Sequence, residues 1–212
     1  CGVPYGRHFD RNRLMTSLVT NEAGDGLAIS SKGRTAAELM VFARYVMFSE
    51  VYWHHTVRAA TAMLQRAFYD LYGQLDLDGL FRMTEQPMIE QMTQVAAGGP
   101  AGELLDGLFG STRRLYKRVT QFSYFQDSKI YERLARRPYP WLIACGDQLA
   151  DLVSRQLGKR VAPHEILFDA PPVKREIEFG VEIYFPKEDC YRALGDVSPV
   201  VKTLAREQFD DY

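Results

Sequence analysis

The sequence predicts a mainly α-helical protein with a small α+β lobe at its C-terminal end. Helical spacing of apolar residues continues without proline or glycine from about residue 35 to Tyr72, which predicts one long central helix. Alternation of apolar and charged residues over Glu176–Phe185 instead predicts a half-buried strand. This change of pattern divides the chain into a helical core over residues 1–160 and the α+β lobe over residues 161–212.

The residues before the long helix predict a short helix and a hairpin. Asp10 is a suitable N-cap for a helix through Leu18, because its carboxylate can accept the free N–H groups of the first turn. The turn-forming segment Gly24–Gly26 favours a β-hairpin near residues 19–30. Thr35–Glu38 has the sequence of a capping box, which predicts the start of the long helix.

Several shorter elements follow the long helix. Ile166–Phe168 is a candidate partner for the predicted strand, and Ser198 with Pro199 forms an N-cap that opens a last helix to about Phe209. Helical spacing also predicts helices near residues 102–109, 112–122, 128–136 and 141–157.

Composition limits the class of protein. The 212 residues suit one or two domains, and 46% apolar and 25% charged residues are ordinary globular values. A net charge of −1 argues against a general nucleic-acid binder but allows a local basic patch. Cys1, Cys145 and Cys190 are odd in number and far apart, which favours a reducing compartment. Without an apolar run of membrane-spanning length or a signal peptide, the sequence predicts a soluble cytoplasmic protein with no membrane partner.

The start of the chain allows two interpretations. Cys1–Gly6 is turn-rich and lacks an initiator methionine, which favours a boundary within a longer protein. The alternative is that Cys1 is a processed N-terminal nucleophile with its own α-amine as the base. Such sites are usually built on stacked sheets, and the predicted fold is helical.

A polar stripe on the long helix is the first candidate site. Arg44, Phe48 and Tyr52 follow i, i+4, i+8 spacing and therefore share one helical face. At ~1.5 Å per residue, Arg44 and Tyr52 are about 12 Å apart. This span suits an arginine fork on one phosphate and a tyrosine hydroxyl on a second phosphate or a sugar. The alternative is an arginine paired with a carboxylate and a tyrosine packed in the core.

The histidines do not form a recognisable metal motif. His54 and His55 are adjacent, so their rings point about 100° apart on a helix and cannot easily share one ion. His8 and His164 are distant in sequence, and the chain has neither an H-E-x-x-H motif nor a His-Asp dipeptide. The sequence therefore predicts no metal site within this chain. A partly buried His54 and an exposed His55 are the structural alternatives.

A basic cluster is the second candidate site. Arg113, Arg114, Lys117 and Arg118 would form one compact face of the predicted 112–122 helix. Such a face can hold a triphosphate or an RNA backbone. The alternative is a solvated face paired with local acids.

A series of short motifs also occurs in a fixed order over roughly residues 1–120. They are Gly2-Val3-Pro4-Tyr5-Gly6-Arg7, Phe9-Asp10 with Arg13-Leu14, Arg44, Tyr52-x-His54 and Arg113-x-Leu115-Tyr116-Lys117. This ordered set resembles the HD-domain metal-dependent phosphohydrolases, and the branch it resembles most is the deoxynucleoside triphosphate triphosphohydrolases. Ile166–Asp169 resembles the C-terminal lobe of that family more loosely.

The resemblance implies a helical HD-family core segment that follows the metal site. In that family a His, a His-Asp pair and a later Asp hold the metal, and all of them would lie before Cys1. A divalent metal ion is therefore expected in the intact enzyme, with none of its ligands in this chain. The 212 residues alone are expected to be inactive.

The resemblance also implies roles for individual residues. Arg44 and Tyr52 would be the catalytic contacts to the substrate phosphates and sugar. Trp53 would lie near the base, where a relative carries an amide residue. The regulated relatives form an activating nucleotide site between subunits, which implies a homo-oligomer. The residues expected in that regulatory site are Asp10, Arg13, His54, His55, Arg113 and Lys117, although relatives often have lysine at the position of His55.

The leading hypothesis is therefore the C-terminal part of an HD-family enzyme that hydrolyses (deoxy)nucleoside triphosphates to nucleoside and triphosphate. The alternative is a non-catalytic nucleotide-binding or oligomerisation module that uses the Arg113–Arg118 face as its anion site. A third hypothesis, a helical RNA-binding protein, is the weakest because the net charge is near neutral.

Overall fold

Helices make up most of the chain, and a small mixed sheet joins segments from both of its ends. The computed structural model describes residues 9–123, 125–170 and 180–206. It confirms the predicted class, a mainly α-helical protein with a small α+β part. The chain forms two units, one of residues 1–53, 123–125 and 175–212, and one of residues 54–122 and 126–174.

The first unit contains the sheet. Its strands are β1 (Leu18–Thr20), β2 (Leu27–Ser30), β3 (Glu182–Phe185) and β4 (Cys190–Ala193), in the order β1-β2-β3-β4. The β1/β2 and β3/β4 pairs are antiparallel, and β2 pairs with β3 in parallel. The antiparallel β1/β2 pair confirms the hairpin predicted near residues 19–30.

The turn of the first hairpin has the conformation that its sequence favours. Gly24 has a φ of +77°, a left-handed conformation that glycine adopts without strain. The side-chain oxygen of Asn21 accepts a hydrogen bond from the backbone N–H of Gly26 at 2.9 Å. These local contacts fix the register in which Leu18 lies opposite Ile29.

The strand predicted over Glu176–Phe185 is shorter in the structure, and the prediction of its partner is wrong. Of the predicted Glu176–Phe185 strand, Glu182–Phe185 forms β3, whereas residues 176–179 lie outside the described part of the chain. Ile166–Phe168 is not a strand, because it belongs to the second unit and packs against α8 (Tyr139–Leu157), where the Ile166 carbonyl approaches Gly146. The predicted boundary near residue 160 consequently does not coincide with the division between the two units.

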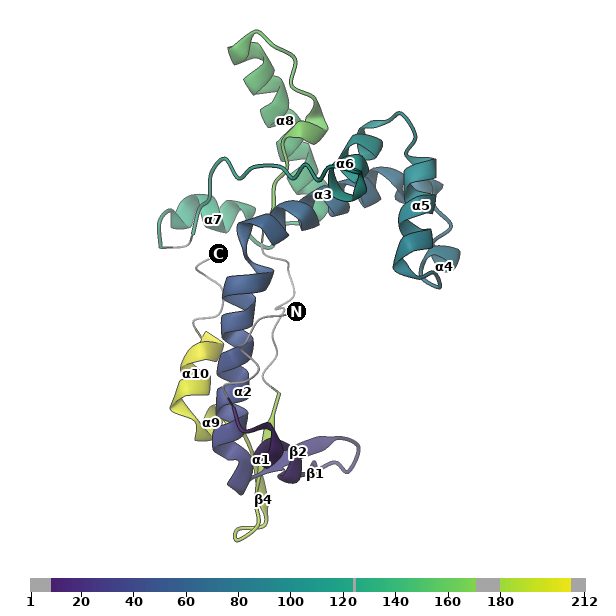
Figure 1. The fold of residues 1–212 in the computed structure, drawn as a ribbon. Helices are drawn as coiled ribbons and strands as arrows, with labels where there is room; N and C mark the ends of the chain where they lie inside the picture. Colours follow the sequence, from purple (N-terminus) through teal and green to yellow (C-terminus); the bar gives the residue numbers. More distant parts are fainter. Residues whose placement is uncertain (1–8, 124, 171–179, 207–212) are drawn as a thin grey trace. The chain divides into compact units, whose positions relative to one another are not determined.

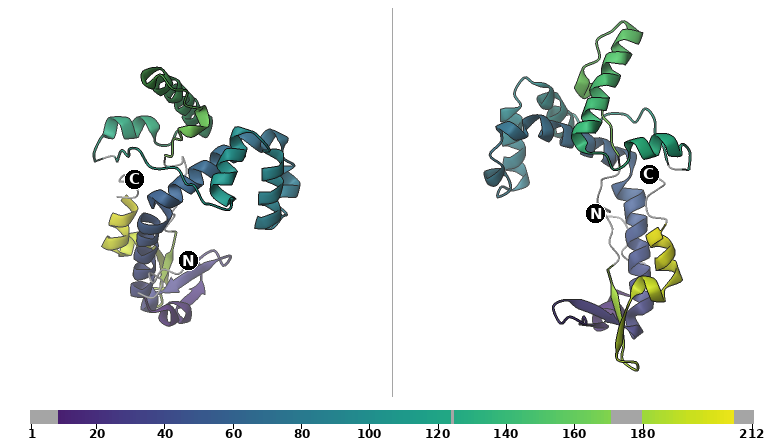
Figure 2. Two further views of the ribbon diagram at one scale, coloured as in Figure 1. Left: turned by 45° about the horizontal axis from the view of Figure 1, so that its top comes forward. Right: turned by 180° about the vertical axis from the view of Figure 1, so that it is seen from behind.

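Helices α1 (Arg11–Thr16), α2 (Arg34–Met47), α9 (Leu194–Val197) and α10 (Pro199–Arg206) complete the first unit. α10 runs beside α2, as the two views of Figure 2 show. Buried apolar side chains from the sheet and these helices form one core. The core residues are Leu14, Ile29, Ala36, Ala37, Val41, Ile183, Leu194 and Val201.

Two of the three predicted caps are present. The Asp10 side chain accepts a hydrogen bond from the Arg13 N–H at 2.9 Å, and the Ser198 hydroxyl accepts one from the Val201 N–H at 3.3 Å. The Thr35–Glu38 capping box is not formed. A 3₁₀ turn, η2 (Ser31–Gly33), leads directly into α2, and Glu38 pairs with Arg34 at 3.5 Å instead.

The prediction of one long helix is wrong in one respect. The helix is interrupted near its middle. α2 continues into a π-helical turn, η3 (Phe48–Tyr52), which closes with a hydrogen bond from the Trp53 N–H to the Phe48 carbonyl at 2.9 Å. His54 then adopts a non-helical backbone, with φ −59° and ψ 130°. Its Nδ1 accepts a hydrogen bond from the Thr56 N–H at 3.3 Å, so the imidazole caps a new helix, α3 (His55–Leu71).

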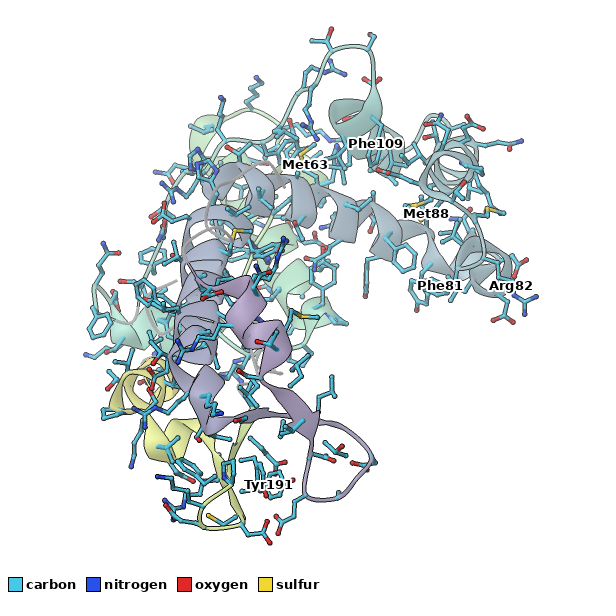
Figure 3. All side chains as sticks on the ribbon, turned by 60° about the horizontal axis from the view of Figure 1, so that its bottom comes forward. Met63, Phe81, Arg82, Met88, Phe109 and Tyr191 are labelled. Carbon is cyan, nitrogen blue, oxygen red and sulfur yellow. The ribbon has the colours of Figure 1, made fainter. Side chains whose placement is uncertain are left out.

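The regular elements of the second unit are all helical in the described part of the chain. Met63 of α3 is buried in its core with Leu104 and Leu105 of α6 (Pro100–Phe109), and Figure 3 labels Met63 and Phe109. The predicted helices near residues 102–109, 128–136 and 141–157 are confirmed as α6, α7 and α8. No helix in the described part of the chain is long and apolar enough to cross a membrane. The remaining elements are η4 (Tyr72–Gln74), α4 (Leu77–Leu80), α5 (Glu85–Val95), α6 (Pro100–Phe109), α7 (Ser128–Leu134) and η5 (Pro163–Glu165).

The prediction of a helix over residues 112–122 is wrong. This segment runs as coil between α6 and α7 (Figure 1). The Arg114 N–H donates to the Gly107 carbonyl at 2.8 Å, and the Tyr116 N–H donates to the Met63 sulfur at 3.4 Å. The Tyr116 N–H thus donates to Met63 rather than to a carbonyl four residues earlier in the chain, and the basic residues of this segment do not share one helical face.

Candidate functional site

A pocket in the first unit contains the predicted polar stripe. Arg44 comes from the last turn of α2, and Phe48 and Tyr52 come from the two ends of the π-helical turn. The Arg44 guanidinium carbon lies 6.0 Å from the centroid of the Phe48 ring, which in turn lies 4.9 Å from that of Tyr52. The pocket has a volume of about 440 Å³ and is lined by Phe9, Met40, Ala43, Arg44, Met47, Phe48 and Tyr52.

The chemistry of this lining is mixed. Arg44 and Tyr52 are exposed and supply the one charged side chain and the one hydroxyl among the lining residues. The other walls are apolar or aromatic. The pocket can therefore hold an anionic group at the guanidinium and a planar or apolar group against the methionines.

Sequence reasoning missed most of the apolar wall. Met40 and Met47 lie four residues before and three residues after Arg44, so helical spacing already placed them on the same face of α2. Phe9 comes from a distant part of the sequence, and no local pattern indicates its contact. Trp53, predicted to lie near a base, is half-buried and directly follows Tyr52, but it is not one of the lining residues.

The second unit holds a positively charged cluster of exposed side chains. The rings of His54 and His55 are 4.2 Å apart, between centroids. Loss of hydration lowers the pKa of His55, and the positive charges of His54, Arg118 and Lys117 lower it further. These four side chains therefore act on one another, although they do not lie on one helix.

The structure does not bring the whole predicted regulatory set together within one unit. His54, His55, Arg113 and Lys117 belong to the second unit, whereas Asp10 and Arg13 belong to the first. Asp10 caps α1, and the Arg13 Nε donates to the Lys32 carbonyl at 2.9 Å. Both first-unit side chains thus have structural partners. The regulatory role of the set stays a prediction.

A buried arginine network in the second unit escaped the sequence interpretation. The Arg66 Nε donates to both carboxylate oxygens of Asp70 at 3.1 Å, and its Nη1 donates to Asp147 at 3.3 Å. Burial raises the pKa of Tyr139 to about 12, and the Asp70 and Asp169 charges contribute to the rise while Arg66 opposes it. This network links α3 to α8.

A second arginine anchors the segment after η5. The Arg58 Nε and Nη2 donate to the two carboxylate oxygens of Asp169 at 2.7 and 2.6 Å. This bidentate pair fixes the end of residues 166–170 on α3. The spacing of 111 residues between the partners explains why sequence analysis assigned Arg58 no role.

The side chains that the structure describes do not fit a divalent metal ion. Within the described ranges, no group of three or more His, Cys, Asp or Glu side chains is placed to hold one. The buried His164 uses its Nε2 to contact a single carboxylate, that of Glu103, at 2.9 Å. We therefore assign no metal-dependent step to these residues.

Comparison with known proteins identifies the family. Residues 9–212 match the family described as HD associated region. The chain belongs to this family. It is 27% identical over 207 residues to the uncharacterized protein MJ1154 of Methanocaldococcus jannaschii, which amounts to 96% of this chain and 42% of that protein.

The HD-associated chain also has a counterpart among solved structures. A crystal structure of a phosphohydrolase (BT4208) from Bacteroides thetaiotaomicron is 18% identical, covers 94% of this chain and 53% of that chain, and has a TM-score of 0.47. The HD-associated chain thus spans about half the length of the two relatives or less.

Proposed function

We propose that this HD-associated chain supplies substrate-binding side chains to an HD-family phosphohydrolase that acts on (deoxy)nucleoside triphosphates. The observation that carries the proposal is the shared pocket of Arg44 and Tyr52. Family membership supports it, because the matched region includes every residue that lines the pocket. The metal of such an enzyme would have to be held outside the described residues.

Each polar side chain has a role in the proposal. Arg44 would neutralise charge on a phosphate, and its stacking on Phe48 restricts the orientation of the guanidinium fork. The Tyr52 hydroxyl would bond a second phosphate oxygen or the sugar. A cation that is already oriented before the substrate binds stabilises developing negative charge without further reorganisation. Trp53 would contact the base from the end of the same turn.

Product analysis tests the proposal. A protein that joins this chain to an HD metal domain is expected to release deoxynucleoside and triphosphate from dGTP or dATP. The 212-residue chain under the same conditions is expected to release neither, since it lacks a metal-binding group within its described part. Ion-exchange chromatography separates triphosphate from pyrophosphate and orthophosphate. Efficient metal-dependent hydrolysis by the 212 residues alone, or orthophosphate as the first product of the joined protein, would contradict the proposal.

A non-catalytic nucleotide site in the second unit is the second candidate. The observation that favours it is the cluster of His54, His55, Lys117 and Arg118, in which the two histidine rings are 4.2 Å apart and loss of hydration, together with the neighbouring positive charges, lowers the pKa of His55. A triphosphate placed against these cations would relieve their mutual repulsion.

Thermal unfolding distinguishes the two candidates. If the second unit binds nucleotide, GTP, dGTP or dATP at 100 times its Kd should stabilise the 212-residue chain by about 2.7 kcal/mol. Lys117→Glu or Arg118→Glu should abolish this stabilisation, whereas Arg44→Glu should not. Arg82→Glu, at another exposed arginine of the second unit, is the matched control. If Arg82→Glu lost as much of the stabilisation by nucleotide as the cluster variants, the cluster would be excluded as the binding site.

A further inference from the structure

Residues 117–122 form an edge of backbone without partners in the second unit. All six side chains are exposed, and Val119 is 95% exposed. Among the described residues, none forms a backbone hydrogen bond with this segment. Its sequence, Lys-Arg-Val-Thr-Gln-Phe, nevertheless contains β-branched and aromatic residues that favour strands. The segment has the composition of a strand but lies in no sheet.

The neighbouring hydrogen bonds indicate which side of this edge is free. The N–H groups of Arg114 and Tyr116 both point inward, to Gly107 of α6 and Met63 of α3. In an extended backbone, the N–H and C=O groups of alternate residues point to the same side. In a strand that continues this period of two through residue 122, the even-numbered residues would face the same way as Arg114 and Tyr116. The N–H and C=O groups of Lys117, Val119 and Gln121 would then face outward.

The charge around the edge is positive and largely uncompensated. Arg114 pairs with Asp106, and Arg118 donates to the side chain of Gln121. Arg113, Lys117 and Arg118 form no ion pair with any carboxylate in the described part of the chain. Besides loss of hydration, the positive charges of Arg118 and Lys117 help to lower the pKa of His55. A strand that paired with this edge would meet these cations at the Lys117–Arg118 end of the segment.

We propose that the outward edge of residues 117–122 binds an acidic, extended peptide of a partner protein as an added β-strand. The backbone groups of Lys117, Val119 and Gln121 would form the ladder, and either Lys117 or Arg118, whose side chains lie on opposite faces of a strand, would attract the carboxylates of a peptide that carries them on one face. A second copy of the same edge fits poorly, because residues 117–122 contain no carboxylate that could pair with Lys117 and Arg118. Single-stranded RNA would satisfy the cations but would leave the alternating backbone groups unused.

A designed peptide tests both parts of the proposal. The probe is EVEIEVE, acetylated, amidated and labelled with a fluorophore, and its binding to the 212-residue chain is measured by anisotropy. The proposal expects saturable binding that weakens as salt is added. The matched control has the same sequence with N-methyl groups at alternate amides, prepared in both registers. These groups remove donors from one edge and leave the charge unchanged. One of the two N-methylated peptides should lose binding to the chain, while the other should retain it.

Proline substitutions in the chain supply the complementary test. Val119→Pro removes an outward N–H and should weaken binding about tenfold, the value of one lost hydrogen bond with its unpaired partner. Thr120→Pro removes an N–H on the opposite side and should leave the affinity within about threefold. Because both side chains are exposed, thermal unfolding should confirm that both variants fold. The pair of variants therefore reports on backbone direction rather than on stability.

Three results would overturn the proposal. Equal binding of the unmodified peptide and both N-methylated peptides would reduce the interaction to charge alone. Equal loss in Val119→Pro and Thr120→Pro would contradict the assigned direction of the backbone. Saturable binding of oligouridylate by a chain that does not bind EVEIEVE would assign the edge to RNA instead.

Discussion

Replacing Arg44 with alanine is expected to lower kcat/KM for dGTP by about 10²–10³-fold in a protein that joins this chain to an HD metal domain, the usual cost of losing one oriented charge-stabilising group. The reason is geometric. The guanidinium lies in a pocket that supplies no other cation, so no neighbouring lining residue can replace it. Steady-state kinetics with triphosphate detection measures the loss.

Two further variants make this result specific. Arg34→Ala removes another exposed arginine from the same helix, one that pairs with Glu38 and lies outside the pocket, and it should leave kcat/KM unchanged. Arg44→Lys keeps the charge but not the planar fork, and it should recover only part of the activity. A rise in KM with unchanged kcat in Arg44→Ala would limit Arg44 to ground-state binding. Unchanged kcat/KM would remove Arg44 from the site.

The elements that sequence reasoning predicted are those set by local chemistry. Asp10 caps α1 through its own carboxylate, and Ser198 with Pro199 opens α10, because a cap involves residues only three positions apart. The hairpin near residues 19–30 depends on Gly24, and α8 follows from its own apolar spacing. In each case the stabilising contacts lie within the segment that carries the pattern.

The elements that it missed depend on distant or unusual partners. β2 pairs with β3 across more than 150 residues, and no local pattern encodes that choice. The 112–122 segment has helical apolar spacing, yet it is coil, and the N–H groups of Arg114 and Tyr116 donate to Gly107 and Met63 instead. At His54 the chain leaves the helix without proline or glycine, because an imidazole serves as the cap, a role usually taken by Ser, Thr, Asp or Asn.

The candidate site was predictable only along one helix. The stripe of Arg44, Phe48 and Tyr52 follows from i, i+4 spacing and persists through the π-helical turn, where the Phe48 and Tyr52 rings remain in contact. The contribution of Phe9 depends on tertiary structure, and so does the approach of Lys117 to His55. Sequence spacing therefore finds the side chains that share a helix but not those that complete the pocket from elsewhere.

Replacing Arg66 with alanine should lower the free energy of unfolding of the second unit by about 2–4 kcal/mol. Arg66 is 7% exposed and makes hydrogen bonds to both Asp70 and Asp147. Its removal leaves a cavity and two carboxylates without their cation. The expected loss is below that of a fully buried triad, because the Asp70 and Asp147 side chains are 26% and 44% exposed and can rehydrate. Urea unfolding followed by far-UV circular dichroism measures it.

A volume-matched variant separates charge from packing. Arg66→Met retains most of the buried volume, so its stability reports the net value of the ion pairs alone. If Arg66→Met is as stable as the natural chain and Arg66→Ala is not, Arg66 acts through packing. If both lose stability and the Arg66→Met loss disappears in an Asp147→Asn background, the link between α3 and α8 is electrostatic. Arg82→Ala, at an exposed arginine of the same unit, should change stability by less than about 0.5 kcal/mol, and a larger loss there would show that the comparison does not isolate the buried network.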